Sequence, residues 1–183
     1  MKKAAVFLDR DGTLNIEKGY LFRLEDWEWI PGVLEAIVRI NRMDLFAIVV
    51  TNQAGIARGY YSDAAVHELH QGVDQLLARA GARIDAYYYC PHHSKHGTVR
   101  DCACRKPSPG LLFQAQIDHE IDLSRSWLIG DKLSDVEAGF RAGVSPILVQ
   151  TGYGEQESIL ADSSLRVETD VLSAVRYIES LQQ

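Results

Sequence analysis

Near its start the chain reads AAVFLDRDGT over residues 4–13. An uninterrupted apolar run that stops at acidic residues is typical of a strand buried on both faces of a parallel sheet. Asp9 and Asp11 follow the run two residues apart, so their side chains can face the same way, and Gly12 permits a sharp turn. Two carboxylates this close repel each other unless one is protonated or a cation lies between them. A hard divalent ion such as magnesium suits oxygen ligands, so this stretch predicts both a first strand and a magnesium site at its carboxyl end.

Four more short apolar runs predict strands at residues 46–50, 86–89, 126–129 and 146–149. Helical patterns lie between or after them, at about 31–42, 62–80, 108–117, 134–143 and 169–181. This alternation predicts right-handed crossovers and a Rossmann-like α/β fold, with a parallel sheet covered by helices on both faces. The irregular stretches 15–30 and 91–107 are too short for a large cap domain. We therefore expect one domain over residues 1–183.

Composition narrows the function. The 183 residues are 46% hydrophobic and 24% charged, which is ordinary for a globular protein. A formal net charge of −6 disfavours nucleic acid as a partner but leaves a small anionic substrate open. The chain shows no apolar run long enough to span a bilayer and no signal peptide, so no membrane partner is expected. Three clustered cysteines favour a reducing compartment, and we expect a cytoplasmic monomer.

Polar residues gather where the other predicted strands end. Ligands of open parallel sheets bind beyond the carboxyl ends of the strands. Thr51 ends the second strand with a hydroxyl suited to phosphate oxygens, and Lys106 offers a positive charge for a phosphoryl group. Asp131 follows the fourth strand and is expected at the same metal, whereas Asp135 fits either the site or the start of a helix equally well. Singly, Thr51 and Lys106 fit a turn and a solvated cation better, so their convergence carries the prediction.

The cysteines form a second pattern. Cys90 and His92 are followed, across a short loop, by Cys102 and Cys104. Three thiolates and one imidazole suit a closed tetrahedral zinc site that orders residues 90–104. His93 is a rival ligand to His92, and idle thiols beside surface histidines are the alternative to a metal site. We expect such a zinc ion to be structural and not catalytic.

The order of these motifs resembles the haloacid dehalogenase (HAD) superfamily of phosphotransferases, and the match spans Asp9 to Asp135. The resemblance implies that Asp9 attacks phosphorus and becomes an aspartyl phosphate, while Asp11 acts first as acid and then as base. It implies that Thr51 and Lys106 stabilise the transferring group. It also implies magnesium ligands from the Asp9 side chain, the Asp11 backbone carbonyl and Asp131.

The cysteine loop, with Cys-Pro-His-His and then Cys-x-Cys-Arg-Lys-Pro, looks like the zinc-bearing HAD phosphatases. Among these, residues 51–59, 130–132 and 18–20 are closer to the heptose bisphosphate phosphatases than to the histidinol-phosphate phosphatases. Ala54 departs from a serine that is frequent in that group. The resemblance implies hydrolysis of the 7-phosphate of D-glycero-D-manno-heptose 1,7-bisphosphate, on the route to nucleotide-activated heptose for lipopolysaccharide core or surface glycan. It implies that the following residues surround the substrate: Glu17, Gly19, Tyr20, Asn52, Gln53, Arg105 and Lys132.

Three other functions stay open from the sequence. Histidinol phosphate is the alternative substrate. A phospho-accepting signalling domain also gathers aspartates, a threonine and a lysine around magnesium, but it lacks a second acid placed like Asp11. A catalytically inactive binding module held together by zinc is a third. The preferred anomer of the heptose, and hence the ADP-heptose or GDP-heptose route, is not decided by any motif.

Overall fold

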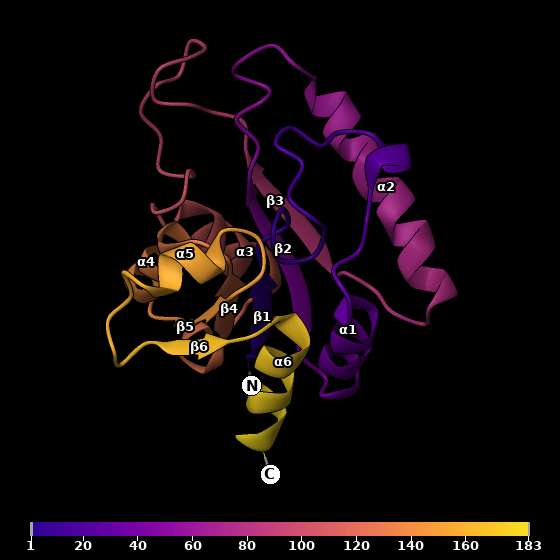
Figure 1. The fold of residues 1–183 in the computed structure, drawn as a ribbon, viewed down its shortest axis with the longest axis vertical. Helices are drawn as coiled ribbons and strands as arrows, with labels where there is room; N and C mark the ends of the chain where they lie inside the picture. Colours follow the sequence, from indigo (N-terminus) through magenta and orange to yellow (C-terminus); the bar gives the residue numbers. More distant parts are fainter. Residues whose placement is uncertain (1, 183) are drawn as a thin grey trace.

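The computed structural model of the chain describes residues 2–182 as a parallel sheet with helices on both faces (Figure 1). All five expected strands form, at nearly the predicted positions. The strands are β1 (Ala5–Leu8), β2 (Phe46–Asn52), β3 (Ala86–Cys90), β4 (Trp127–Gly130), β5 (Ser145–Val149) and β6 (Arg166–Glu168). The longer helices are α1 (Val33–Arg42), α2 (Asp63–Arg79), α3 (Gly110–His119), α4 (Leu133–Ala142) and α6 (Val171–Ser180).

The two faces of the sheet carry separate hydrophobic cores. Alternate residues of a strand point to opposite faces, so Val6 and Leu8 of β1 pack with α1, α2 and α6, whereas Ala5 and Phe7 pack with α3 and α4. In Figure 1, α1 and α2 lie on one side of the sheet, and α3 and α4 lie on the other. The central strands are therefore buried on both faces, which confirms the parallel α/β sheet expected from their continuous apolar runs.

The strand order places a ligand site next to β1. The order across the sheet is β3-β2-β1-β4-β5-β6, with parallel pairing throughout. From β1 the strands β2 and β3 are added on one side, and β4, β5 and β6 are added on the other, so the topological switch point lies between β1 and β4. A crevice forms at such a point beyond the carboxyl ends of the strands. Phe7 pairs with Ile48 on one side and with Leu128 on the other, so β1, β2 and β4 end close together.

Four short elements were not expected from the sequence. They are the edge strand β6, the helix α5 (Gly154–Ser158) and the 3-10 turns η1 (Leu24–Asp26) and η2 (Leu123–Arg125). Each is five residues or shorter, so none carries a hydrophobic period long enough to read. None of the helices formed by residues 2–182 has the length and apolarity needed to cross a membrane.

Candidate active site and cysteine cluster

The residues predicted at the strand ends meet at one edge of the sheet. Asp9 follows β1, and its backbone N–H donates to the carbonyl of Ile129 in β4 at 2.9 Å. Thr51 lies near the end of β2, and Asp131 follows β4 directly. The parallel order of β2, β1 and β4 therefore brings three predicted residues together, as expected from the sequence.

Lys106 reaches this group from the loop after the cysteines. Its buried ammonium donates to Asp9 Oδ1 at 2.7 Å and to the carbonyl of Val50 at 2.7 Å, and it pairs with Asp135 Oδ1 at 2.6 Å. Burial lowers the pKa of Lys106, but the charges of Asp135 and Asp9 outweigh it and raise that pKa above its ordinary value. Asn52 holds the Lys106 backbone through two hydrogen bonds of 3.1 Å. Lys106 is therefore a fixed cation beside Asp9.

Three buried acids cluster at this point, and two of them, Asp9 and Asp135, contact Lys106. Carboxylate oxygens of Asp9, Asp131 and Asp135 lie within 4.8 Å of one another. Burial and the neighbouring Asp9 raise the pKa of Asp131 to about 8, and burial raises the pKa of Asp135 to about 6 despite the opposing charge of Lys106. Lys106 alone does not balance three carboxylates.

Asp131 shows where a further cation fits. Its Oδ2 accepts from the N–H of Tyr153 at 2.9 Å, whereas its buried Oδ1 has no hydrogen-bond partner among residues 2–182. Asp135, by contrast, is occupied on both oxygens, by Lys106 and by the N–H of Lys132 at the start of α4. A buried acceptor without a partner, next to Asp9, suits a hard dication with oxygen ligands. Both readings of Asp135 from the sequence, site residue and helix cap, therefore apply.

Gly12 allows Asp131 to approach β1. Gly12 has a φ of 86°, in the left-handed region that favours glycine. A Cβ atom at this position would lie 2.2 Å from Asp131 Oδ2. Both the backbone turn and the close approach of Asp131 therefore require glycine at position 12.

Asp11 is held by a network that sequence reasoning missed. Arg10 is 1% exposed and donates to both carboxylate oxygens of Asp11, at 2.9 to 3.2 Å. Asn15 and Gln53 add hydrogen bonds of 3.0 Å each. An arginine beside two aspartates in a loop carries no sequence signal that separates a buried partner from a solvated one. The one available signal for burial of Arg10 was its position two residues after a buried apolar strand, directly behind Asp9.

A polar cavity of about 350 Å³ opens above these residues. Ten of its eleven lining residues were predicted at the site or, for Asp135, weighed for it. Glu17 on the loop before η1 pairs with Lys132, with Oε2 and Nζ 3.6 Å apart, and both residues line the cavity. The lining residues are Asp9, Asp11, Glu17, Gly19, Thr51, Asn52, Arg105, Lys106, Lys132, Ser134 and Asp135.

Two residues expected around the substrate lie off the cavity wall. Gln53 is 1% exposed and is enclosed by Arg10, Asp11 and Thr51. Tyr20 is 41% exposed and packs edge-on against Tyr60, with ring centroids 4.7 Å apart. Neither is among the residues that line the cavity within residues 2–182. The structure therefore does not bring Gln53 or Tyr20 to the cavity.

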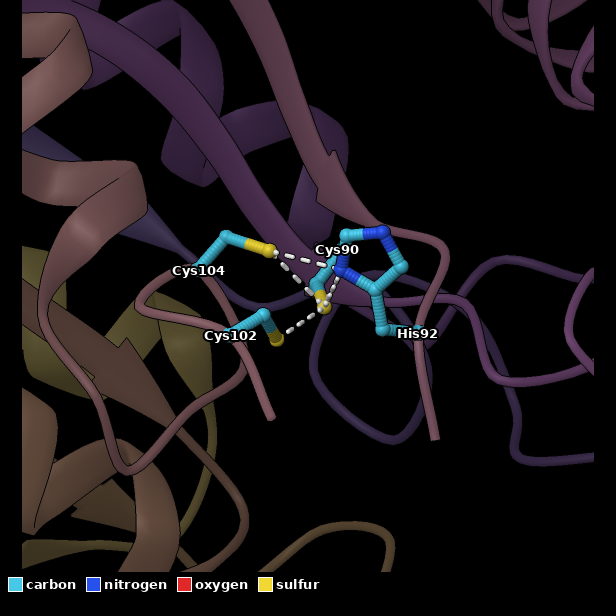
Figure 2. A group of neighbouring side chains, drawn as sticks. All are labelled: Cys90, His92, Cys102 and Cys104. Carbon is cyan, nitrogen blue, oxygen red and sulfur yellow. Dashed lines mark hydrogen bonds between the residues drawn. The ribbon is translucent and has the colours of Figure 1, made fainter. Parts of the chain in front are cut away.

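The cysteine loop forms the expected four-residue cluster. Figure 2 shows Cys90, Cys102, Cys104 and His92 pointing toward one another. The Sγ atoms of Cys104 and Cys90 are 3.1 Å apart, and Cys104 Sγ lies 3.3 Å from His92 Nδ1. One ligand atom from each of the four lies within 4.8 Å of the others, which fits a tetrahedral zinc ion.

The structure separates the two candidate histidines. His93 turns away from the cluster. Its Nε2 lies 3.2 Å from Arg58, and its Nδ1 accepts from the Lys95 N–H.

Burial raises the pKa of the Cys102 thiol, but the backbone N–H of Arg105 and the neighbouring cluster members bring it to about 7. A thiol poised this way is suited to deprotonation by a metal ion.

Arg105 connects the cluster to the cavity. Its Nη1 donates to the carbonyl of His92 at 3.0 Å, while the side chain lines the cavity. In Figure 1 the loop after β3 rises beyond the end of the sheet where the cavity lies. Ordering this loop therefore also orders a cation at the cavity mouth.

The chain is similar to known phosphatases. A family model described as HAD-hydrolase-like matches residues 103–175. A D-glycero-D-manno-heptose-1,7-bisphosphate 7-phosphatase of Thermosynechococcus vestitus is 49% identical over 85% of this chain and 83% of its own length. A D-glycero-beta-D-manno-heptose-1,7-bisphosphate 7-phosphatase of Vibrio cholerae is 44% identical over 96% of this chain and 94% of its own. The crystal structure of a D,D-heptose 1,7-bisphosphate phosphatase from B. bronchiseptica, complexed with magnesium and phosphate, superposes with a TM-score of 0.88 and 32% identity over 97% of this chain and 99% of its own.

The sheet order is that of the HAD class, with Asp9 after β1, Lys106 after β3 and Asp131 after β4. The fold and site therefore define a phosphoric monoester hydrolase of this class. Identity above 40% along most of the chain resolves the class further. Within it, the chain belongs to the family of D-glycero-D-manno-heptose-1,7-bisphosphate 7-phosphatases.

Proposed function

We propose that this enzyme removes the 7-phosphate of D-glycero-D-manno-heptose 1,7-bisphosphate, through a phosphoryl group carried on Asp9 and with the help of Mg²⁺. The observation that supports this most is the position of Asp9. It lies on the cavity wall, 2.7 Å from a buried lysine and within a cluster of three acids. The named activity of the relatives supports the substrate.

The acid cluster fits magnesium. Asp9 and Asp131 would hold the ion with their side chains, and the Asp11 backbone carbonyl is the third protein ligand that we propose. The unpartnered Oδ1 of Asp131 supports this assignment. When bound, magnesium neutralises the charge of the phosphoryl oxygens and orients them. The B. bronchiseptica phosphatase structure was obtained with magnesium and phosphate, which agrees with this proposal.

The first step transfers the phosphoryl group to Asp9. Its carboxylate oxygen attacks phosphorus while the bond to the sugar oxygen breaks, and Asp11 donates a proton to that leaving oxygen. Lys106 and the Thr51 hydroxyl stabilise the charge on the transferring oxygens, because phosphoryl transfer depends mostly on positioning and electrostatics. All four side chains line the same cavity.

The second step releases phosphate. Asp11, now without its proton, accepts a proton from water as that water attacks the aspartyl phosphate. Asp9 is thereby regenerated and inorganic phosphate leaves. Turnover distinguishes this enzyme from a phospho-accepting signalling domain and from an inactive binding module, both of which lack the second step.

The far end of the substrate carries a second phosphate, for which the cavity offers cations. Arg105 and Lys132 both line it, and Glu17 opposite Lys132 can accept hydrogen bonds from sugar hydroxyls. The charges of Asp131 and Asp9 keep the pKa of Lys132 above its ordinary value against the effect of burial, so it stays cationic. We assign the distal phosphate to Arg105 and Lys132.

We further propose that Cys90, His92, Cys102 and Cys104 hold a structural zinc ion. Four protein ligands leave no open coordination position, so the ion would order the loop and not take part in the reaction. The product would be a heptose 1-phosphate, an intermediate suited to nucleotide activation for surface glycans. A small phosphorylated sugar, and no macromolecule, is the partner we propose.

The experiment compares substrates directly. Phosphate release with magnesium would be followed for both anomers of the heptose 1,7-bisphosphate and for histidinol phosphate, at matched concentrations. We expect a strong preference for the heptose, and the preferred anomer names the ADP-heptose or GDP-heptose route. Preference for histidinol phosphate would overturn the substrate, and the absence of release from all three would overturn the proposed activity.

A further inference from the structure

Gln53 stands at the centre of a buried hydrogen-bond network. Its side-chain Nε2 donates to Asp11 Oδ2 and to Thr51 Oγ1, at 3.0 Å each. Its Oε1 accepts from the Tyr61 hydroxyl at 2.7 Å and from Arg10 at 3.2 Å. One amide therefore touches two residues of the reaction that lie on different segments, after β1 and at the end of β2.

The chemistry of the neighbours fixes the orientation of this amide. The guanidinium of Arg10 can only donate hydrogen bonds, so it must face the amide oxygen and not the amide nitrogen. The opposite end then faces Asp11 and Thr51 as a donor. A rotated amide would place two donors against each other at Arg10 and two acceptors against each other at Asp11, so these two residues select one orientation. The Tyr61 hydroxyl then donates to the amide oxygen and holds it in place.

This orientation has a consequence for Thr51. Because the Thr51 oxygen accepts from Gln53, its own hydrogen remains available to point toward the cavity that Thr51 lines. A hydroxyl that donates toward the cavity is the polarity that a phosphoryl oxygen requires. Gln53 thus sets the direction of the Thr51 hydroxyl without contact with substrate.

The same amide limits the motion of Asp11. The Asp11 side chain is 15% exposed and lines the cavity, while Arg10, Asn15 and Gln53 hold its two oxygens at 2.9 to 3.2 Å. A carboxylate that exchanges protons with the leaving oxygen must be placed within hydrogen-bond reach of it. Contacts from three side chains leave Asp11 little freedom to rotate.

The network also reaches the loop before η1. Arg10 donates to the carbonyl of Leu21 at 2.9 Å, and the ring of Tyr61 stacks on Phe22 with centroids 5.2 Å apart. Tyr61 fits closely because residue 55 is glycine: a Cβ there would lie 2.2 Å from the Tyr61 ring. The parts that orient Gln53 are therefore themselves held by packing.

From this arrangement we propose that Gln53 is a positioning residue, oriented by Arg10 and held by Tyr61, that aligns the proton-transfer group Asp11 and the phosphoryl-binding hydroxyl of Thr51. The inference rests on the proposed function of the site. It gives Gln53 a role behind the cavity wall in place of contact with substrate. The distinguishing effect is on proton transfer to the leaving oxygen, which a sugar alkoxide needs and a nitrophenolate does not.

The test is a single-turnover comparison of two substrates, the heptose 1,7-bisphosphate and 4-nitrophenyl phosphate, with enzyme in excess. We expect Gln53→Met to lower the rate of ester cleavage by about 100-fold for the bisphosphate, within the range of general acid catalysis. For the nitrophenyl ester we expect the rate to fall by only about tenfold. Tyr61→Phe removes one of the two hydrogen bonds that hold the amide oxygen, so it should shift the ratio of the two rates the same way but less. A role in packing alone would lower both rates equally.

Two reference variants separate the possible failures. Asp11→Asn should give the largest shift in the ratio, and Gln75→Met, the same change at an exposed position of α2, should leave both rates as in wild type. If Asp11→Asn shifts the ratio but Gln53→Met and a folded Tyr61→Phe do not, the positioning role is wrong and the proposed function stands. If wild type releases no phosphate from the bisphosphate, or Asp11→Asn leaves the ratio unchanged, both proposals fall.

Discussion

Asp131 depends on the residue at position 12 for its place in the site. Gly12→Ala would put a Cβ 2.2 Å from Asp131 Oδ2 and would strain a φ of 86°. Displacement of a reacting group by about 1 Å can cost about 100-fold in rate, so we expect kcat to fall by about that factor. Steady-state phosphate release would measure it.

Gly81→Ala is the matched control for that substitution. Gly81 also has a positive φ, of 70°, but a Cβ there would meet nothing within 4 Å. It should cost stability, of order 1–2 kcal/mol for a left-handed residue, without a fall in kcat. Equal kcat losses in both variants would mean that backbone strain, and not displacement of Asp131, limits the rate.

His70 makes the free energy of unfolding depend on pH. It is buried in α2, stacks on Tyr87 with centroids 4.2 Å apart, and its Nε2 has no hydrogen-bond partner within residues 2–182. Burial, and then the charge of Arg10, lower the pKa of His70 to about 3, against 6.5 for the unfolded chain. Only the unfolded chain then gains a proton between these values, so the stability is fully present above pH 6.5 and is lost as the pH falls toward 3.

The slope expected from this residue is about 1.4 kcal/mol per pH unit below pH 6.5. His70→Phe keeps an aromatic ring against Tyr87 and cannot titrate, so its unfolding free energy should fall less steeply between pH 6.5 and 5. Urea unfolding at several pH values measures both slopes. Identical slopes would show that the folded protein accommodates a charged His70.

Some residues of the site could be placed from the sequence and others could not. Asp9, Asp11 and Asp131 could be predicted to share a site because each follows a buried strand, and parallel strands end at one edge. The buried partners of Asp11 could not, because whether Arg10 or Gln53 faces solvent depends on loops that the motif does not fix. The family resemblance implied that Gln53 surrounds the substrate, whereas the structure buries its side chain behind Asp11 and Thr51.

At the scale of elements, the cysteine loop tests the zinc assignment. Cys102→Ala removes one of four ligands, so we expect zinc content per chain to fall well below that of wild type and residues 91–107 to become more sensitive to protease. His93→Ala is the matched control, because His93 lies outside the cluster and contacts Arg58. Full zinc content in Cys102→Ala, or loss of zinc in His93→Ala, would contradict the ligand set.

The elements that the sequence predicted are those with a strong period. The strands from β1 to β5 are continuous apolar runs, and the five longer helices carry apolar residues at helical spacing. The edge strand β6 has three residues, one of them exposed and none fully buried, so its formation depends on pairing with β5 and not on its own pattern. The sequence of so short a segment does not indicate which strand it will pair with.

At the scale of the whole molecule, the site is built from segments that are distant along the chain. The cavity takes residues from the end of β2, from the loops after β1, β3 and β4, and from the start of α4, and the shared sheet edge is what joins them. The convergence of four motifs predicted this part of the account. The monomeric state stays a prediction, and on the surface α3 exposes Phe113 and, at 72%, Ile117, one helical turn apart.

A rapid acid quench shows whether Asp9 carries the phosphoryl group during turnover. Enzyme mixed with the heptose 1,7-bisphosphate and magnesium would be quenched within the first turnover, digested and analysed by mass spectrometry. We predict one added phosphoryl group on the peptide that contains Asp9, and neither label nor turnover in a folded Asp9→Asn variant. Phosphate release by Asp9→Asn at the wild-type rate, or a label on any other residue, would contradict the account.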